Sequence, residues 1–324
     1  MDTVSYSNAV ILGTGQVGMA LMEQLVERRV KVTLVNRRGR VGEPLPEGVQ
    51  LAAADVNDAA AVTRIAQDAT VVFATVQPDY TQWPEKFPPL VRSLIDGIAK
   101  TDARLVFVDN LYMYGPTHGQ PLREDLPYAA TGPKGRTRAQ VASLLLEAHR
   151  AGRIRVAIGR ASDFFGPRVT ATAVFGERFF GAIWKGNPVD LFGNPDLPHT
   201  YTYVPDFARA LITLSKHEAA YGRAWHVPNA GTVSTREMVR LFEEALRQPI
   251  KCRTINRFMV ALAALFVPMV RELKELAYEF EEPYIVDDTA FRAAFGADTT
   301  PLASAVAETA EWFRERTQQI QKAA

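Results

Sequence analysis

The stretch that decides the fold is residues 8–18, Asn8-Ala9-Val10-Ile11-Leu12-Gly13-Thr14-Gly15-Gln16-Val17-Gly18. An apolar strand runs directly into the pattern Gly-x-Gly-x-x-Gly. The first glycine allows a tight turn, the second lets the backbone approach a pyrophosphate, and the third lets the next helix pack on the strand. A pyrophosphate at such a turn accepts hydrogen bonds from free N–H groups at the helix N-terminus. The turn therefore predicts a dinucleotide site contacted by Gly13, Thr14, Gly15, Gln16, Val17 and Gly18.

The next apolar strand, residues 31–35, ends in Asn36-Arg37-Arg38. A site for NAD usually has Asp or Glu at this place, where the carboxylate binds the ribose 2′-hydroxyl. Two guanidinium groups instead suit a 2′-phosphate, which a carboxylate would repel. We therefore predict NADP(H) as the cofactor. The alternative is a plain glycine turn between a buried strand and helix, followed by two solvated arginines.

The composition bounds the class of protein. A chain of 324 residues with 47% apolar content is long enough for a large core and two lobes. The net charge of +1 gives no bulk attraction for nucleic acid or for an anionic membrane. The lone Cys252 excludes an intrachain disulfide, and no signal peptide is visible, so we expect a cytoplasmic protein. The most apolar run, Phe258–Val270, is too short to span a bilayer and is interpreted as a buried or lid helix.

Apolar runs alternate with amphipathic ones through the first half of the chain. The strand candidates are residues 9–12, 31–35, 49–53, 70–74, 104–108 and 155–158, and the helix candidates are 17–27, 59–67, 89–99 and 136–150. Such alternation with continuously apolar strands predicts a parallel sheet covered on both faces. We predict an α/β fold of Rossmann type, with a dinucleotide-binding domain over residues 1–160. Residues 161–324 are expected to form a smaller, mostly helical substrate lobe that interleaves with the sheet.

Several further motifs follow these landmarks in order. They are Asp55-Val56 after the third strand, Ala74-Thr75 at the end of the fourth, the run from Val108 to Gly115, Arg160-Ala161-Ser162-Asp163-Phe164-Phe165-Gly166-Pro167, and Tyr203-Val204-Pro205-Asp206-Phe207-Ala208. Together they resemble the short-chain dehydrogenase/reductase superfamily, in its extended or atypical, NAD-dependent epimerase-like branch. The resemblance implies that Asp55 and Val56 contact the adenine, and that the backbone at Ala74 and Thr75 passes the cofactor.

The catalytic positions of that superfamily are altered in this chain. The resemblance implies a Ser or Thr that holds a carbonyl oxygen, a Tyr that moves the proton, and a Lys four residues later. Aligning on the Tyr-Gly pair at 114–115 puts Asn110 at the Ser position, and aligning on the following helix puts Lys134 and Arg138 at the Tyr and Lys positions. We predict Asn110 and Lys134 as catalytic groups, with Tyr112 as a rival proton donor. The alternative is that Lys134 and Arg138 only bind the cofactor ribose and phosphates.

Two regions are expected to line the substrate pocket, the loop after the fourth strand and the second lobe. The predicted residues are Gln77, Tyr80, Trp83, Phe87, Asp163, Phe164, Phe180, Trp184, His199 and Tyr201. So many aromatic side chains predict a mostly apolar substrate. No His or carboxylate cluster has metal-ligand spacing, and we predict no metal.

These features lead to a prediction of function. We expect an NADPH-dependent reductase of a small, mostly apolar carbonyl or enone compound, with Asn110 and Lys134 in place of the usual Ser and Tyr. Two alternatives remain open: a non-catalytic NADP-binding sensor or partner-binding protein, and a sugar-nucleotide epimerase or dehydratase. The substrate is expected to be a small molecule, and a homodimer is an expectation from the resemblance alone.

Overall fold

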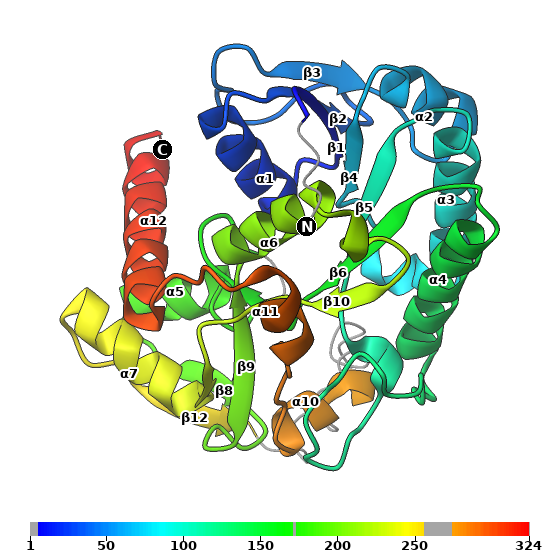
Figure 1. Cartoon of the computed structure of the whole chain (residues 1–324). Coiled ribbons are helices and arrows are strands. Elements are labelled where there is room, and N and C mark those ends of the chain that lie inside the picture. The colour runs from blue at the N-terminus through cyan, green and yellow to red at the C-terminus, as the bar shows by residue number, and fades with distance from the viewer. Residues whose placement is uncertain (1–5, 171–172, 256–273, 324) are drawn as a thin grey trace.

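A seven-stranded parallel sheet forms the centre of the molecule, which we describe from a computed structural model (Figure 1). The structure describes residues 6–170, 173–255 and 274–323. The strand order is β10-β6-β5-β4-β1-β2-β3. The strands are β1 (Asn8–Leu12), β2 (Lys31–Asn36), β3 (Gln50–Ala53), β4 (Val71–Ala74), β5 (Arg104–Asp109), β6 (Val156–Arg160) and β10 (Ala224–His226). The order reverses between β1 and β4, and ligands of such folds bind at this point.

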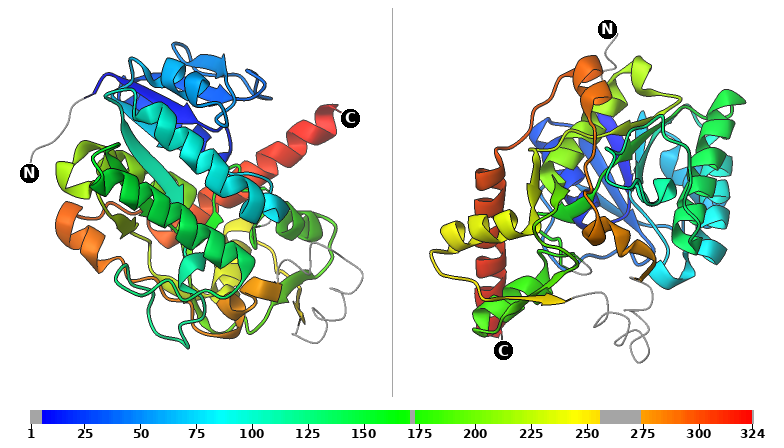
Figure 2. Two further views of the ribbon diagram at one scale, coloured as in Figure 1. Left: turned by 90° about the vertical axis from the view of Figure 1, so that its right-hand side faces the viewer. Right: turned by 90° about the horizontal axis from the view of Figure 1, so that it is seen from below.

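Helices cover both faces of this sheet, as Figure 2 shows. On one face α1 (Gln16–Glu27) packs against α6 (Val204–Lys216). On the other face α3 (Trp83–Ile98) packs against both α2 (Ala59–Ala66) and α4 (Pro133–Arg150). The apolar residues of β1 serve both cores, because Ala9 and Ile11 join one cluster whereas Val10 and Leu12 join the other.

A second region packs beside the carboxyl ends of the main strands. It contains α5 (Glu177–Trp184), the sheet β11-β9-β7 and the parallel pair β12-β8. These strands are β7 (Asp163–Phe165), β8 (Val189–Phe192), β9 (Pro198–Tyr203), β11 (Thr232–Ser234) and β12 (Cys252–Ile255). The helices α7 (Thr235–Leu246) and α12 (Leu302–Ala323) pack against each other, and their aromatic core includes Phe180 stacked on Phe313 at 4.1 Å between ring centroids.

The predicted Rossmann-type fold is confirmed, and the six predicted strands are β1 to β6 within one or two residues. The helix predicted from residue 89 begins six residues earlier, at Trp83. Prolines 88 and 89 favour a helix start at that point, yet the apolar face of the helix continues before them, through Trp83 and Phe87. The strand β10 returns to the main sheet from beyond residue 160, and the division into two lobes stays a prediction.

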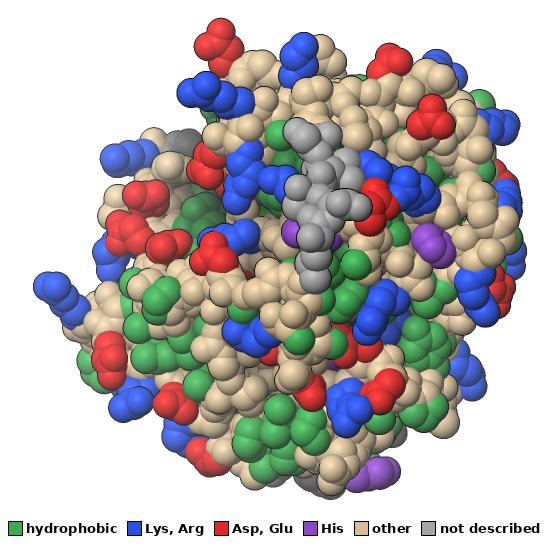
Figure 3. Space-filling model, viewed as in Figure 1, with side chains coloured by type: hydrophobic (Ala, Val, Ile, Leu, Met, Phe, Trp, Pro, Cys, Tyr) green, Lys and Arg blue, Asp and Glu red, His purple; other side chains and the backbone are tan. Residues whose placement is uncertain are grey.

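Lys and Arg side chains are interspersed with Asp and Glu over the face shown in Figure 3. Within the part of the chain that the structure describes, no helix combines the length and the apolar character needed to cross a bilayer. The predicted buried or lid helix Phe258–Val270 lies outside the described residues.

Candidate functional site

A cavity of about 1750 Å³ opens at the carboxyl ends of the parallel strands. One part of its wall comes from the glycine turn before α1 and from the ends of β2, β4 and β5. The other part comes from β7, from α5 and β8, and from the short helix α10 (Tyr278–Glu281). The cavity therefore joins the predicted dinucleotide site to the second region without interruption.

The glycine turn leaves the N-terminus of α1 open to this cavity. Gly13 has a φ of +116°, which L side chains rarely adopt, and a Cβ at Gly18 would lie 2.1 Å from the Gly13 carbonyl oxygen. A Cβ at Gly15 would meet no atom within 4 Å among the described residues, and no side chain there caps the helix. Gly13, Gly15, Gln16 and Val17 line the cavity. Free N–H groups at this terminus suit an anionic pyrophosphate.

At the end of β2, Asn36 is held by its neighbours. Its Nδ2 donates to Thr14 Oγ1 at 3.1 Å and to the Arg40 carbonyl at 3.0 Å, and its Oδ1 accepts from Arg38 N at 2.9 Å. Of the two predicted arginines, Arg37 is among the described residues that line the cavity and Arg38 is not.

The predicted adenine contacts lie across from this strand end. Asp55 and Val56 line the cavity. The pKa of Asp55 is lowered chiefly by the hydrogen bond from Asn57 N, and Arg37 adds a smaller effect. Thr75 lines the cavity and donates its hydroxyl to the Leu12 carbonyl at 3.0 Å, whereas the neighbouring Ala74 side chain is buried in the sheet.

The three predicted catalytic residues divide into two groups. Asn110 and Tyr112 line the cavity, and Asn110 Oδ1 accepts from Tyr112 N at 3.3 Å. Lys134 is 3% exposed and is not among the described lining residues. Its Nζ lies 3.8 Å from Glu275 Oε2 and 4.8 Å from the centre of the Tyr80 ring. The structure thus holds Lys134 beside two residues that do line the cavity, Tyr80 and Glu275.

Arg138 is buried in a set of partners that fixes its guanidinium. Nη1 pairs with Asp109 Oδ1 at 3.2 Å, Nη2 donates to Gln77 Oε1 at 2.7 Å, and the group lies 4.1 Å from the centre of the Trp83 ring. Burial lowers the pKa of Arg138, and the charge of Asp109 opposes that change. Gln77 and Trp83, two of the predicted substrate residues, are therefore brought together with Arg138 in the cavity wall.

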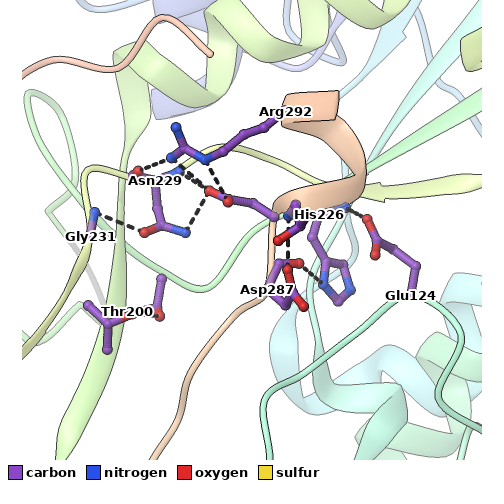
Figure 4. Close-up of polar contacts among 10 residues, drawn as sticks. Glu124, Thr200, His226, Asn229, Gly231, Asp287 and Arg292 are labelled. Carbon is purple, nitrogen blue, oxygen red and sulfur yellow. Dashed lines mark hydrogen bonds and ion pairs between the residues drawn. The ribbon is translucent and has the colours of Figure 1, made fainter. Parts of the chain in front are cut away.

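Behind this wall a network of hydrogen bonds between buried side chains extends to the end of β10. Asp109 Oδ2 accepts from Arg160 Nε at 3.0 Å, Arg160 Nη1 donates to the Tyr114 hydroxyl at 2.6 Å, and that hydroxyl lies 2.9 Å from His226 Nε2. His226 Nδ1 donates to the Asp287 carbonyl at 3.2 Å (Figure 4). In the neutral ring Nε2 therefore accepts from the Tyr114 hydroxyl. Burial, followed by the charge of Arg160, lowers the pKa of His226 to about 3. This network of buried hydrogen bonds links the ends of β5, β6 and β10.

The part of the cavity in the second region, here called the substrate half, contains a carboxylate paired with a histidine. Asp163 lines the cavity and its Oδ2 lies 2.9 Å from Nε2 of the buried His199. His199 Nδ1 lies 3.0 Å from the Glu279 carbonyl oxygen. Glu279 also lines the cavity although the residue is only 3% exposed. Burial, with a smaller contribution from the charge of Asp163, raises the pKa of Glu279 well above its ordinary value.

Other predicted substrate residues lie in different places. Tyr80 and Phe164 line the cavity, whereas Tyr201 is buried behind it with its hydroxyl 2.7 Å from Thr235 Oγ1. Sequence reasoning missed the lining residues Arg178, Lys185, Glu275, Tyr278, Glu279 and Tyr284. The acidic run Glu275–Glu282 has the composition of a solvated helix, and no spacing within it indicates that Glu279 points inward.

The fold, the glycine turn and the continuous cavity define a dinucleotide-binding protein of Rossmann type. A family model places it further: residues 9–227 match the NAD dependent epimerase/dehydratase family, and the chain belongs to that family. The resemblance to the extended branch of the short-chain dehydrogenase/reductase superfamily is thereby confirmed.

Individual relatives agree with this assignment. The chain is 27% identical over 199 residues to UDP-glucose 4-epimerase from Dictyostelium discoideum, which covers 54% of this chain and 57% of that relative. The match thus spans little more than half of the relative's length. The UDP-glucuronic acid 4-epimerase of Bacillus cereus, solved in complex with NAD, superposes with a TM-score of 0.76 at 16% identity over 95% of this chain and 99% of the other. An epimerase from Methanothermobacter thermautotrophicus gives a TM-score of 0.80 at 15% identity over 98% and 95%.

These comparisons correct the predicted function. The prediction of an NADPH-dependent reductase of a small apolar carbonyl compound is wrong, because the relatives are sugar-nucleotide epimerases and dehydratases. The physical reason lies in the aromatic residues on which the prediction rested. Phe180 and Trp184 pack in the core of the second region, and the cavity wall near it presents carboxyl and hydroxyl groups such as Asp163, Glu279 and Tyr278.

Proposed function

We propose that the chain is a nicotinamide-dinucleotide-dependent enzyme acting on a sugar nucleotide, by epimerase or dehydratase chemistry. The observation that carries the proposal is the continuous cavity of about 1750 Å³. Pockets for a single ligand measure roughly 300–1,000 Å³, so this cavity has room for a dinucleotide and a second large molecule together. The names of the relatives support a sugar nucleotide as the second molecule.

Charges along the cavity support two separate anion sites. The open N-terminus of α1, with Arg37 nearby in the cavity wall, suits the pyrophosphate and adenosine half of a dinucleotide. Arg178 and Lys185, on or next to α5, line the cavity in the second region. Two exposed cations there suit the diphosphate of a sugar nucleotide. Acceptor groups of Asp163 and Glu279 then remain for the hydroxyl groups of the sugar.

The residues present fit a nicotinamide dinucleotide, because a Cβ would close the turn at Gly13 and Gly18 and would meet nothing at Gly15. Such a cofactor would supply hydride transfer from the substrate and back. The protein supplies orientation: Thr75 and Val76 line the cavity at the end of β4, and Asn110 and Tyr112 line it at the end of β5. Asn110 remains our proposed hydrogen-bond donor to a substrate oxygen. Lys134, which is held beside Tyr80, is a proposed source of positive charge near that oxygen.

The test is product analysis with defined sugar nucleotides. The purified protein is loaded with NAD or NADP and mixed with UDP-glucose, UDP-N-acetylglucosamine or dTDP-glucose. We expect conversion of at least one to its epimer or to a dehydrated keto sugar, detected by NMR. If the cofactor binds but calorimetry detects no binding of any of the three, a sugar-nucleotide substrate is wrong. If they bind without conversion, the altered Tyr and Lys positions favour the non-catalytic sensor.

The choice between NADP and NAD is a finer proposal. Asn36 leaves no carboxylate at the end of β2, and Arg37 lines the cavity, where a guanidinium group suits a 2′-phosphate; both support NADP. The similar solved structures that contain NAD favour NAD instead. We expect Arg37→Ala to weaken NADP(H) binding about tenfold while NAD(H) binding changes little, with the exposed Arg38→Ala as the matched control. Equal weakening of both cofactors would contradict selection by Arg37.

A further inference from the structure

The Asp163–His199 pair contains one proton between its two side chains. His199 Nδ1 lies 3.0 Å from the backbone carbonyl of Glu279, which can only accept, so Nδ1 carries a hydrogen. His199 Nε2 lies 2.9 Å from Asp163 Oδ2. A hydrogen bond across that distance requires a further proton, on the imidazole or on the carboxyl group. Either arrangement stores a transferable proton at the wall of the cavity.

The two partners differ in their access to the cavity. The Asp163 side chain is 27% exposed and lines the cavity, whereas the His199 side chain is 3% exposed. His199 is also fixed in orientation, because its ring stacks on Phe280 with 5.0 Å between centroids and 10° between planes. Asp163 can therefore meet a substrate, and His199 holds it from behind.

Asp163 also lies where the two halves of the site meet. Its charge contributes to a raised pKa at groups from both halves, after the larger effect of their burial. The charge of Asp163 acts on the titratable side chains of Tyr80, Tyr112, Tyr201, Tyr278, Glu279 and Tyr284, and His199 is hydrogen-bonded to it. Burial keeps the phenols protonated, so they are poor proton acceptors at neutral pH. Among these side chains, the hydrogen-bonded Asp163–His199 pair is therefore the candidate for proton transfer.

A second carboxyl group completes the arrangement. Glu279 Oε1 is buried and has no hydrogen-bond partner among the described residues, and Glu279 lines the same cavity. Burial raises the pKa of this carboxyl group and so favours its neutral form, which can donate as well as accept a hydrogen bond. An unpartnered buried oxygen at a cavity wall is poorly stable without a ligand, and a substrate hydroxyl would supply its partner.

We propose that the Asp163–His199 pair is the proton-transfer group of this site, with Asp163 as the catalytic residue and His199 as its positioning residue. The proposal rests on the proposed function. In the oxidative direction, the C–H electron pair of the reacting sugar carbon leaves as hydride to the oxidised cofactor. The pair must first have released its shared proton to solvent, so that the proton of the hydroxyl on that carbon can pass to Asp163, and the O–H bonding electrons form the carbonyl π bond. In the reductive direction, the same proton returns to the oxygen. Glu279 holds a neighbouring hydroxyl.

The first test needs no substrate. Proton NMR of the cofactor-loaded protein should show two downfield resonances hydrogen-bonded to the His199 ring, one at each nitrogen. Asp163→Asn should remove the resonance at Nε2 and keep the one at Nδ1, because the amide offers no shared proton. The control Asp196→Asn, at an exposed surface pair with Arg236, should leave both resonances unchanged. A wild-type spectrum without the Nε2 resonance, or one unaffected by Asp163→Asn, would overturn the proposal.

The second test uses a sugar nucleotide that the wild-type protein converts. Asp163→Asn should slow conversion of that sugar nucleotide about 100-fold or more, within the range of general acid–base catalysis. His199→Gln preserves a hydrogen bond to Asp163 but holds no proton, so kcat should fall and its dependence on pH should flatten, with little change in KM. Unchanged kcat and pH profile in both variants would refute proton transfer by the pair. If the wild type converts no sugar nucleotide, the proposed function fails, and the NMR result still decides whether the pair holds a proton.

Discussion

Lowering the pH from 7.5 to 5 should destabilise the protein through His226. The imidazole is fully buried, and its pKa of about 3 compares with an ordinary value of 6.5. In the unfolded chain His226 takes up a proton as the pH falls through 6.5, whereas in the folded chain it stays neutral until about pH 3. The unfolded state therefore binds the extra proton, and stability is lost as the pH falls. Linkage gives a loss of about 2 kcal/mol at pH 5 relative to pH 7.5.

The assay compares wild type with His226→Gln in urea, at both pH values, by tryptophan fluorescence. The Gln side chain can still accept from Tyr114 but does not titrate, so the variant should be less stable at neutral pH yet lose about 2 kcal/mol less on acidification. All other titrating groups are shared by the two proteins and cancel in the difference. His118→Gln, at a side chain that is 89% exposed, should behave like wild type. Equal losses in wild type and His226→Gln, within about 0.5 kcal/mol, would refute the reasoning.

Two further substitutions test the parts that hold the site. Gly18→Ala should weaken dinucleotide binding about tenfold or more in a fluorescence titration, since the new Cβ would lie 2.1 Å from the Gly13 carbonyl oxygen and the turn must shift. Gly42→Ala, where a Cβ meets nothing within 4 Å, is its control, and equal affinities would contradict the packing argument. Asp109→Asn should lower the free energy of unfolding by about 3–5 kcal/mol, because two buried guanidinium groups lose their shared charge. Asp125→Asn breaks only an exposed ion pair and should cost less than about 1 kcal/mol, so similar losses for the two variants would argue against the buried network.

The dinucleotide half of the site was predictable because its signals are local. Gly13, Gly15 and Gly18 lie within six residues, and this spacing predicts a tight turn next to the start of a helix. The strand ends at Asn36 and Asp55 follow from the apolar runs before them. Residues of this half reach the cavity because parallel strands end at one edge of the sheet, whatever the rest of the chain does.

The substrate half was only partly predictable, because its residues come from distant parts of the chain. Asp163 and His199 were both expected near the substrate, but their pairing depends on the parallel alignment of β7 with β9. Glu279 reaches the same wall from a segment 80 residues beyond His199, and its backbone carbonyl sets the tautomer of that ring. The function was predicted wrongly for the same reason, since Phe180 and Trp184 turned out to fill a core.

The sequence by itself determined the Rossmann-type sheet and the open helix terminus at Gly15, because both follow from residue type and short-range spacing. Only the tertiary structure decided which polar groups face the cavity. Lys134 is held beside Glu275 and does not line the cavity among the described residues, while Asp163 lines it with a buried histidine behind. Burial and charge pairing fix the protonation of such groups, and both arise from contacts between segments that lie far apart in the chain.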